Sequence, residues 1–255
     1  MQEPSALGRI VELVRDLRRR CPWDAAQTPE TLRPYLVEEV LELDHAIGSG
    51  DPAAVRDELG DLLLHLAFQI VLGEETGAFG AEDVTRAIER KMHRRHPHLF
   101  ALGDEPASWE RSKLAGDERR GVLDGLPPNL PALIMAYRLQ ERAAGVGFDW
   151  PDAVEPRAKV HEEMEELGAE VDAPTPSRTR IEEEIGDLLF AVVNLSRKLG
   201  CDPRAALERA NQRFLERFRR MESRAAERGI DVGTAGLQKL DELWEEAKTA
   251  MRSEQ

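Results

Sequence analysis

Hydrophobic side chains recur every three or four residues through most of the chain. One such stripe consists of Leu36, Val40, Leu43 and Ile47, and the next of Val55, Leu59, Leu62 and Leu66. This spacing is typical of amphipathic helices that bury one face, and the alternation of a half-buried strand is hard to find. The pattern therefore predicts an all-α protein.

Capping and breaking residues mark the ends of these helices. Thr28 followed by Pro29 predicts a helix start with proline in the first turn. The segment 48–52, Gly-Ser-Gly-Asp-Pro, closes one helix and opens another, and the segment 200–203 does the same before a helix expected over 203–228. Loops this short favour antiparallel neighbours.

The chain contains an internal repeat. Glu-Glu-x-x-Glu occurs at residues 38–42 and 162–166, and Glu-x-Gly-Asp-Leu-Leu follows at residues 58–63 and 184–189. Between the copies, residues 116–131 are rich in glycine and proline and lack a helical stripe. We therefore predict two tandem helical-bundle domains that arose by duplication, covering residues 1–115 and 132–255, with a linker over residues 116–131. A turn-rich segment, residues 145–151, leads into the second copy, and we interpret its aromatic residues as packing anchors.

The acidic residues of each copy keep a fixed position beside the apolar stripe. At 100° per residue, Glu163 and Glu166 fall on one flank of their helix, and Glu184 and Asp187 fall on the corresponding flank of the next. The first copy repeats this arrangement with Glu39, Glu42, Glu58 and Asp61. If the two helices of a copy pack antiparallel, four carboxylates can point toward one place.

A solvated acidic face is the ordinary interpretation of such a run. Here the pattern occurs twice, keeps its phase against the core, and lacks the lysine partners of surface pairing. Gathered carboxylates repel one another unless a metal neutralises them, and oxygen ligands suit Mg²⁺, with Mn²⁺ also possible. A di-iron site is the alternative, because Glu42-x-x-His45 and His65 could supply nitrogen. The second copy has Ala169 in place of His45 and no counterpart of His65, so Mg²⁺ is favoured there, and we interpret both histidines as structural or incidental.

Composition limits the possible partners. With 35 basic and 49 acidic residues the net charge is −14, which disfavours general binding to nucleic acid. The two cysteines, Cys21 and Cys201, are far apart and fit a reducing compartment rather than a disulfide scaffold. No apolar segment is long enough to span a bilayer, so we expect no membrane partner and a cytoplasmic protein.

Magnesium held by carboxylates usually serves a phosphate substrate, which needs positive charge nearby. Lys159 lies one turn before Glu163, and Arg180 lies just before Glu184. Arg213 and Arg217 share one face of a later helix, although most arginines of that helix must be solvated. Trp244 could stack on a base or could close a core.

These motifs resemble the MazG family of nucleoside triphosphate pyrophosphohydrolases, in its long, two-domain form. Besides the two carboxylate motifs, the resemblance rests on the segments Cys21–Asp24 with Gln27-Thr28, Arg94–His98, Gly147–Trp150, Asn211–Phe214 and Arg217-Phe218. It implies an all-α fold, a homodimer, and Mg²⁺-dependent hydrolysis of nucleoside triphosphates to monophosphate and pyrophosphate. The expected role is clearing damaged nucleotides or trimming a nucleotide pool.

The resemblance also implies roles for individual residues. The metal ligands would be Glu163, Glu166, Glu184 and Asp187, with Glu39, Glu42, Glu58 and Asp61 as a second set. The substrate-binding residues would be Lys159, Arg180, Glu183, Arg213, Arg217 and Trp244. Glu162 or Glu163 would orient or deprotonate the attacking water, and spacing does not rank them.

The second domain is expected to be the catalytic one. In the first copy Ala54, Met92 and His98 stand where the second has Arg180, Asn211 and Arg217, although Arg94 does match Arg213. These departures put the phosphate contacts of the first domain in doubt. The alternative function is a non-catalytic nucleotide-binding or interaction scaffold, which the complete second carboxylate set argues against.

Overall fold

A computed structural model of the chain describes residues 5–100 and 121–253. Every regular element in these ranges is a helix, which confirms the predicted all-α fold. The chain forms two compact units, residues 1–107 and 108–255. Because the division between them falls outside the described ranges, the bounds 1–115, 116–131 and 132–255 remain predictions.

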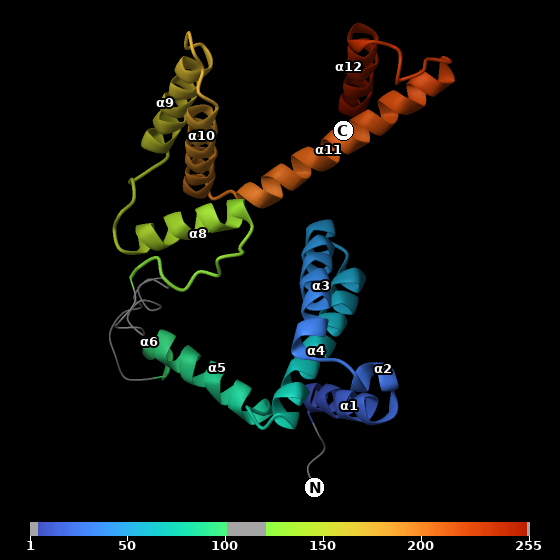
Figure 1. The fold of residues 1–255 in the computed structure, drawn as a ribbon, viewed down its shortest axis with the longest axis vertical. Coiled ribbons are helices and arrows are strands. Elements are labelled where there is room, and N and C mark those ends of the chain that lie inside the picture. The colour runs from blue at the N-terminus through green and yellow to red at the C-terminus, as the bar shows by residue number, and fades with distance from the viewer. Residues whose placement is uncertain (1–4, 101–120, 254–255) are drawn as a thin grey trace. The chain divides into compact units, whose positions relative to one another are not determined.

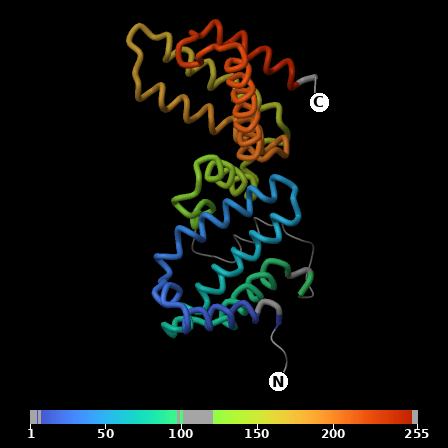
Figure 2. The backbone as a smooth tube through the Cα atoms, turned by 90° about the vertical axis from the view of Figure 1, so that its right-hand side faces the viewer, coloured from blue at the N-terminus to red at the C-terminus, as the bar shows by residue number. Residues whose placement is uncertain are grey.

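The first unit is built around a long antiparallel helix pair. Its helices are α1 (Ala6–Arg20), α2 (Pro22–Ala25), α3 (Pro29–Ser49), α4 (Pro52–Glu75), α5 (Ala81–Arg95) and α6 (Pro97–Phe100). Helices α3 and α4 lie side by side, and α1 packs against α4 (Figures 1 and 2). The core of this unit is formed by Val14, Leu32, Ala67, Phe68, Val71 and Leu72.

Local sequence explains where the α3–α4 hairpin turns. The Thr28 hydroxyl accepts a hydrogen bond from the backbone N–H of Thr31 at 3.3 Å, and Pro29 occupies the first turn of α3. Gly50 ends α3 with φ +73°, a conformation that costs glycine least. Asp51 then caps α4 by accepting from Ala53 N at 2.9 Å. Each cap is worth about 1 kcal/mol, and these positions confirm the predicted helix ends.

Salt bridges fasten α1 to the end of α4. Arg15 donates to Glu74 at 2.7 Å, and Arg18 donates to Glu75 at 2.6 Å. Arg18 also donates to the backbone carbonyl of Asp24 in α2 at 2.7 Å and to that of Gln27 in the following loop at 3.1 Å. These contacts lie at the C-terminal end of α4, away from the acidic residues that the repeat places on the hairpin.

The second unit contains its own helix hairpin. Its helices are α8 (Ala132–Gly145), α9 (Val154–Val171), α10 (Arg178–Lys198), α11 (Pro203–Glu227) and α12 (Leu237–Ser253). Helix α9 packs along α10, and α8 packs against α10 (Figure 1). Helices α11 and α12 pair with each other around Met221, Ala225, Leu243 and Ala247. Asp202 caps α11, which ends at Glu227, one residue before the predicted bound.

The segment before α9 is held differently from our expectation. Phe148 is 83% exposed and Trp150 is 41% exposed, so the interpretation of these aromatics as packing anchors was wrong within the described ranges. The side chain of Asp149 is the anchor, because it accepts hydrogen bonds from Arg197 and Lys198 of α10.

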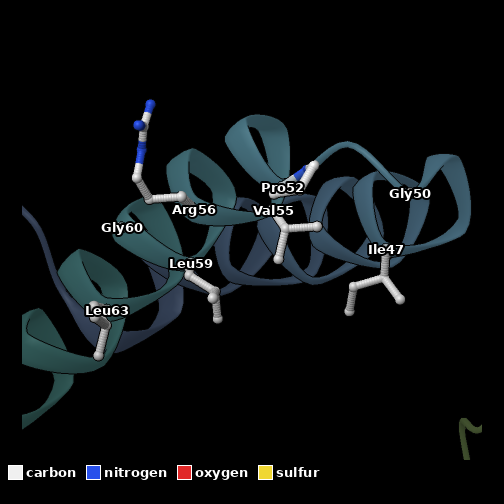
Figure 3. Close-up of a pocket in the computed structure, with 8 residues that line it drawn as sticks. All are labelled: Ile47, Gly50, Pro52, Val55, Arg56, Leu59, Gly60 and Leu63. Atoms are coloured by element: carbon white, nitrogen blue, oxygen red, sulfur yellow. The ribbon is translucent and has the colours of Figure 1, made fainter.

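Both hairpins expose large apolar side chains. In α3 and α4 these include Val37, Val40, Leu41, Ile47 and Leu59, and in α9 and α10 they include Met164, Val171, Ile185, Leu189, Phe190 and Val192. In Figure 3, Ile47, Val55, Leu59 and Leu63 point to the same side of the first hairpin and line an apolar groove. Apolar side chains exposed together on one face are typical of an interaction surface. None of the helices in the described ranges is long and apolar enough to cross a membrane.

Candidate metal centre

Three of the four predicted carboxylates of the second copy meet between α9 and α10. Glu163 and Glu166 project from α9 and Glu184 projects from α10, and one oxygen of each lies within 4.8 Å of the others. We call these three residues the second cluster. The side chain of Glu163 is only 7% exposed, so the cluster has one deeply placed oxygen donor and two nearer the solvent.

The second cluster concentrates negative charge. Burial raises the pKa of Glu184, and the neighbouring carboxylates of Glu166, Asp187, Glu163 and Glu170 raise it further. A divalent cation among these oxygens would remove this repulsion. Because the three donors are all carboxylate oxygens, the cluster suits a hard cation such as Mg²⁺ or Mn²⁺.

The remaining acidic candidates of the second copy lie at the edge of this cluster. Asp187 is exposed and outside the group of three, although its charge reaches Glu184. Glu162 is 57% exposed, and Glu183 is also exposed. Glu170, which the sequence interpretation did not include, also raises the pKa of Glu184. It lies one helical turn after Glu166, a spacing that could have indicated it.

Lys159 pairs with the acidic residues that follow it. Its Nζ lies 2.7 Å from Oε1 of Glu162 and 2.7 Å from Oε1 of Glu163. Hydrogen bonds to both carboxylates, first Glu162 and then Glu163, raise the pKa of Lys159, so it stays charged. The predicted phosphate contact therefore lies beside the predicted metal ligands. Lys159 is also a lysine partner of the kind that the sequence interpretation took to be lacking, so that part of the argument for a metal was wrong in the second copy.

Arg180 also lies near the second cluster. Its Nη1 is 3.1 Å from Oε1 of Glu170, while its side chain is 69% exposed. A solvated arginine held by one ion pair can exchange that carboxylate for a phosphate at little cost.

The last three substrate candidates lie on the α11–α12 pair. Arg213 is exposed, and Arg217 is half-buried, with a buried Nε that has no hydrogen-bond acceptor in the described structure. Trp244 packs against the α11–α12 core, with its ring centroid 5.1 Å from that of Phe214. Across the described residues, no ion pair or hydrogen bond joins these three side chains to the second cluster.

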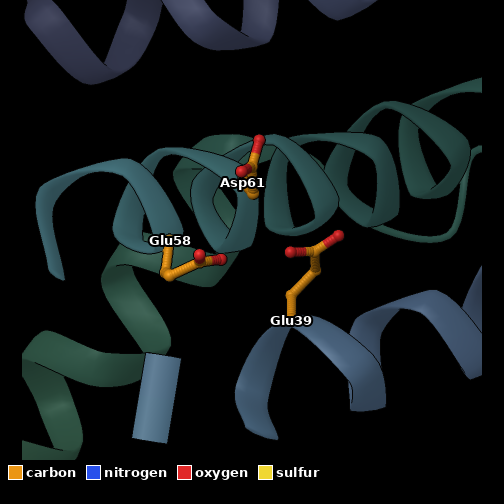
Figure 4. Close-up of side chains that lie close together, drawn as sticks. All are labelled: Glu39, Glu58 and Asp61. Carbon is orange, nitrogen blue, oxygen red and sulfur yellow. The ribbon is translucent and has the colours of Figure 1, made fainter. Parts of the chain in front are cut away.

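A first cluster forms between α3 and α4 from Glu39, Glu58 and Asp61, whose oxygens also lie within 4.8 Å of one another (Figure 4). Glu42 lies outside this group, although it raises the pKa of both Glu39 and Glu58. The two copies thus assemble three carboxylates each, but the one left out is Glu42 in the first and Asp187 in the second.

His65 has a closer relation to the first cluster than the sequence interpretation allowed. Its Nε2 lies 3.6 Å from Oε1 of Glu39. Burial raises the pKa of Glu39, as do Asp61 and Glu42, whereas His65 opposes this shift. His65 follows Asp61 by one helical turn on α4, so helical spacing could have placed it on the acidic face.

Comparison with known protein families agrees with this duplicated architecture. The family model described as the MazG nucleotide pyrophosphohydrolase domain matches residues 27–100 and 156–224. The chain belongs to the MazG family. Each matched stretch contains one carboxylate cluster, so the chain carries two MazG domains, as the internal repeat predicted.

Full-length relatives extend this similarity to nearly the whole chain. The nucleoside triphosphate pyrophosphohydrolase/pyrophosphatase MazG of Thermotoga maritima is 42% identical over 94% of this chain and 94% of its own. The nucleoside triphosphate pyrophosphohydrolase of Escherichia coli K12 is 39% identical over 97% of this chain and 98% of its own. YabN of Bacillus subtilis is 40% identical over 94% of this chain, which spans 51% of that longer protein.

Proposed function

We propose that the protein hydrolyses nucleoside triphosphates between the α- and β-phosphates, giving a nucleoside monophosphate and pyrophosphate. The observation that supports this function is the second cluster, an oxygen-only donor set from two helices of a MazG domain. Relatives that match almost the whole chain are named for this activity.

We assign the metal site of the second domain to Glu163, Glu166 and Glu184, with Asp187 beside them. When bound there, Mg²⁺ or Mn²⁺ would neutralise phosphate oxygens and stabilise the charge that develops on the leaving pyrophosphate. Glu163 is the inner ligand because its side chain is the most buried of the three.

Glu162 is then the better candidate for the general base. It lies outside the second cluster and is 57% exposed, so it can accept a proton from a solvent water. That water attacks the α-phosphorus, the bond from this phosphorus to the bridging oxygen breaks, and pyrophosphate leaves with the bonding electron pair. Lys159, next to Glu162, and Arg180 would bind phosphate oxygens.

We also propose that the protein works as a homodimer. The exposed apolar faces of α3–α4 and α9–α10 support this, because a second copy of the chain offers a surface of the same chemistry. Arg213, Arg217 and Trp244 lie on α11 and α12, and they would contact the nucleotide once the site is assembled.

Product analysis tests the proposed function. The protein is incubated with ATP and Mg²⁺, and the products are resolved by ³¹P NMR. We expect AMP and pyrophosphate, loss of turnover with EDTA, and recovery with added Mg²⁺ or Mn²⁺. Release of ADP and orthophosphate would contradict cleavage at the α–β bond. Saturable ATP binding without any product would favour the scaffold alternative.

The physiological role needs a separate measurement. Clearance of damaged nucleotides predicts faster turnover of modified triphosphates than of ordinary ones, whereas trimming of a nucleotide pool predicts preference for an ordinary base. A panel of both kinds of substrate, compared by kcat/KM, distinguishes these roles.

A further inference from the structure

The two MazG domains hold their inner glutamate in different ways. When the repeated motifs are superposed along the sequence, Glu39 corresponds to Glu163, and the residue one turn earlier is Tyr35 in the first domain and Lys159 in the second. On the following helix, His65 corresponds to Ala191. In the second domain the basic residue is therefore on the same helix as the inner glutamate, and in the first domain it is on the following helix.

The contacts of these residues agree with that exchange. In the second domain, Lys159 reaches Glu163 from the same helix, with Nζ 2.7 Å from Oε1. In the first domain, His65 reaches Glu39 from the facing helix, with Nε2 3.6 Å from Oε1. Ala191 is 7% exposed and has no side-chain nitrogen, so this position of the second domain cannot make the contact that His65 makes in the first.

The ring of Tyr35 lies nearly parallel to the imidazole of His65. Its ring centroid lies 6.4 Å from that of His65, and the two ring planes are inclined by only 17°. The side chain of His65 is 12% exposed, whereas that of Lys159 is 40% exposed. The inner glutamate of the first domain is therefore contacted by a mostly buried side chain, and that of the second domain by a side chain that is partly exposed to solvent.

We propose that His65 is the positioning residue of the first cluster and takes there the place that Lys159 takes in the second. It orients the Glu39 carboxylate for a divalent cation shared with Glu58 and Asp61. This inference rests on the metal-binding role proposed for the second cluster and extends that role to the first cluster, whose three oxygens lie equally close together. Groups that orient a metal ligand typically contribute ten- to a hundredfold to metal affinity.

This exchange has a consequence for the ligand of the first domain. Tyr35 replaces Lys159, and Ala54 replaces Arg180, so neither position offers a cation to a polyphosphate. His65 supplies its nitrogen from a mostly buried position. The first domain is therefore suited to a divalent cation and lacks two of the phosphate contacts of the second.

Mn²⁺ binding to the full chain tests the role of His65. Free Mn²⁺ is measured by electron paramagnetic resonance in a background in which Glu166→Gln and Glu184→Gln remove the second cluster. We expect His65→Leu, which preserves most of the side-chain volume, to weaken Mn²⁺ binding by about ten- to a hundredfold.

Adding Tyr35→Lys to His65→Leu should restore affinity to within a few-fold of the background, because lysine then precedes Glu39 as it precedes Glu163. Circular dichroism melting of each variant checks that the fold is retained, and His65→Gln, which keeps a nitrogen donor, should lose less affinity than His65→Leu.

Unchanged Mn²⁺ affinity in His65→Leu, or no recovery on adding Tyr35→Lys, would overturn the proposal. Absence of any Mn²⁺ binding in the background would overturn it together with the metal role of the first domain. Triphosphate hydrolysis by the unaltered protein is measured separately. A protein that does not hydrolyse ATP but shows the loss and the recovery would contradict the proposed function and support the role of His65.

Discussion

Arg197 and Asp149 form a two-pronged contact between α10 and the loop that precedes α9, with Nη1 of Arg197 3.1 Å from Oδ2 of Asp149. Lys198 adds a further hydrogen bond to the same carboxylate at 3.2 Å. The three side chains are only 12–22% exposed, so water screens them weakly. This contact fixes the start of the hairpin that carries the second cluster.

Replacing Asp149 with Asn should destabilise the second unit. The change removes the negative charge and leaves Arg197 and Lys198 largely buried beside a neutral amide, which costs about 1–3 kcal/mol. Urea unfolding followed by circular dichroism measures this loss. Asp172→Asn, at an exposed position after α9, is the matched control and should leave the unfolding free energy unchanged. Equal stability of the Asp149→Asn variant and the unaltered protein would show that the contact contributes nothing.

The same contact predicts a pH dependence. Hydrogen bonds from Arg197, and then from Lys198, hold the pKa of Asp149 below its usual value. The pKa of Asp149 is lower in the folded protein than in the unfolded chain, where it is about 4. The contribution of Asp149 to the unfolding free energy is therefore fully present above about pH 4, and it is lost as the pH falls through the folded-state pKa. The difference in unfolding free energy between the unaltered protein and Asp149→Asn should therefore be constant near neutral pH and shrink below about pH 4. A difference that grows on acidification would contradict this assignment.

The sequence predicted those features of the fold that depend on neighbouring residues. Thr28, Gly50 and Asp202 mark helix ends in the structure as they did in the sequence, because capping and positive φ are local properties. The repeat predicted two like domains, since equal spacing on equal helices places carboxylates on equal faces. The Asp149–Arg197 contact was not predictable in this way, because it joins side chains that are 48 positions apart.

The candidate site was predictable only in part, for a related reason. Helical phase gives the angle at which a side chain leaves one helix, but the register between two helices decides which oxygens meet. Glu42 therefore lies outside the first cluster and Asp187 outside the second, although both have the expected phase. His65 was set aside because the second copy has no histidine at that position, whereas the structure shows that its partner is on the facing helix.

Variants of the carboxylates should rank the two domains. Glu163→Gln and Asp187→Asn remove charge from the proposed metal site of the second domain. We expect each to lower kcat by about a hundredfold or more, because a bound metal ion contributes several kcal/mol to the stabilisation of the transition state. Glu39→Gln and Asp61→Asn are the matched changes in the first domain and should lower kcat much less. Steady-state kinetics of pyrophosphate release provides the measurement. Equal losses from the two pairs would contradict the assignment of catalysis to the second domain.

A lysine in the apolar groove of the first hairpin should weaken the proposed homodimer. Ile47 is 61% exposed and points with Leu59 to the groove side in Figure 3. If a second copy buries Ile47, Ile47→Lys loses about 1.5–3 kcal/mol of apolar burial in each subunit, and the dimer Kd rises by a hundredfold or more. Sedimentation velocity over a range of protein concentrations measures this change. Arg86→Ala, at an exposed position of α5 that does not line the groove, is the control and should sediment like the unaltered chain, which we expect to have the mass of two copies. An unaltered chain that sediments as a single copy at every concentration would contradict the homodimer, and an Ile47→Lys variant that dimerises normally would place the interface elsewhere on the chain.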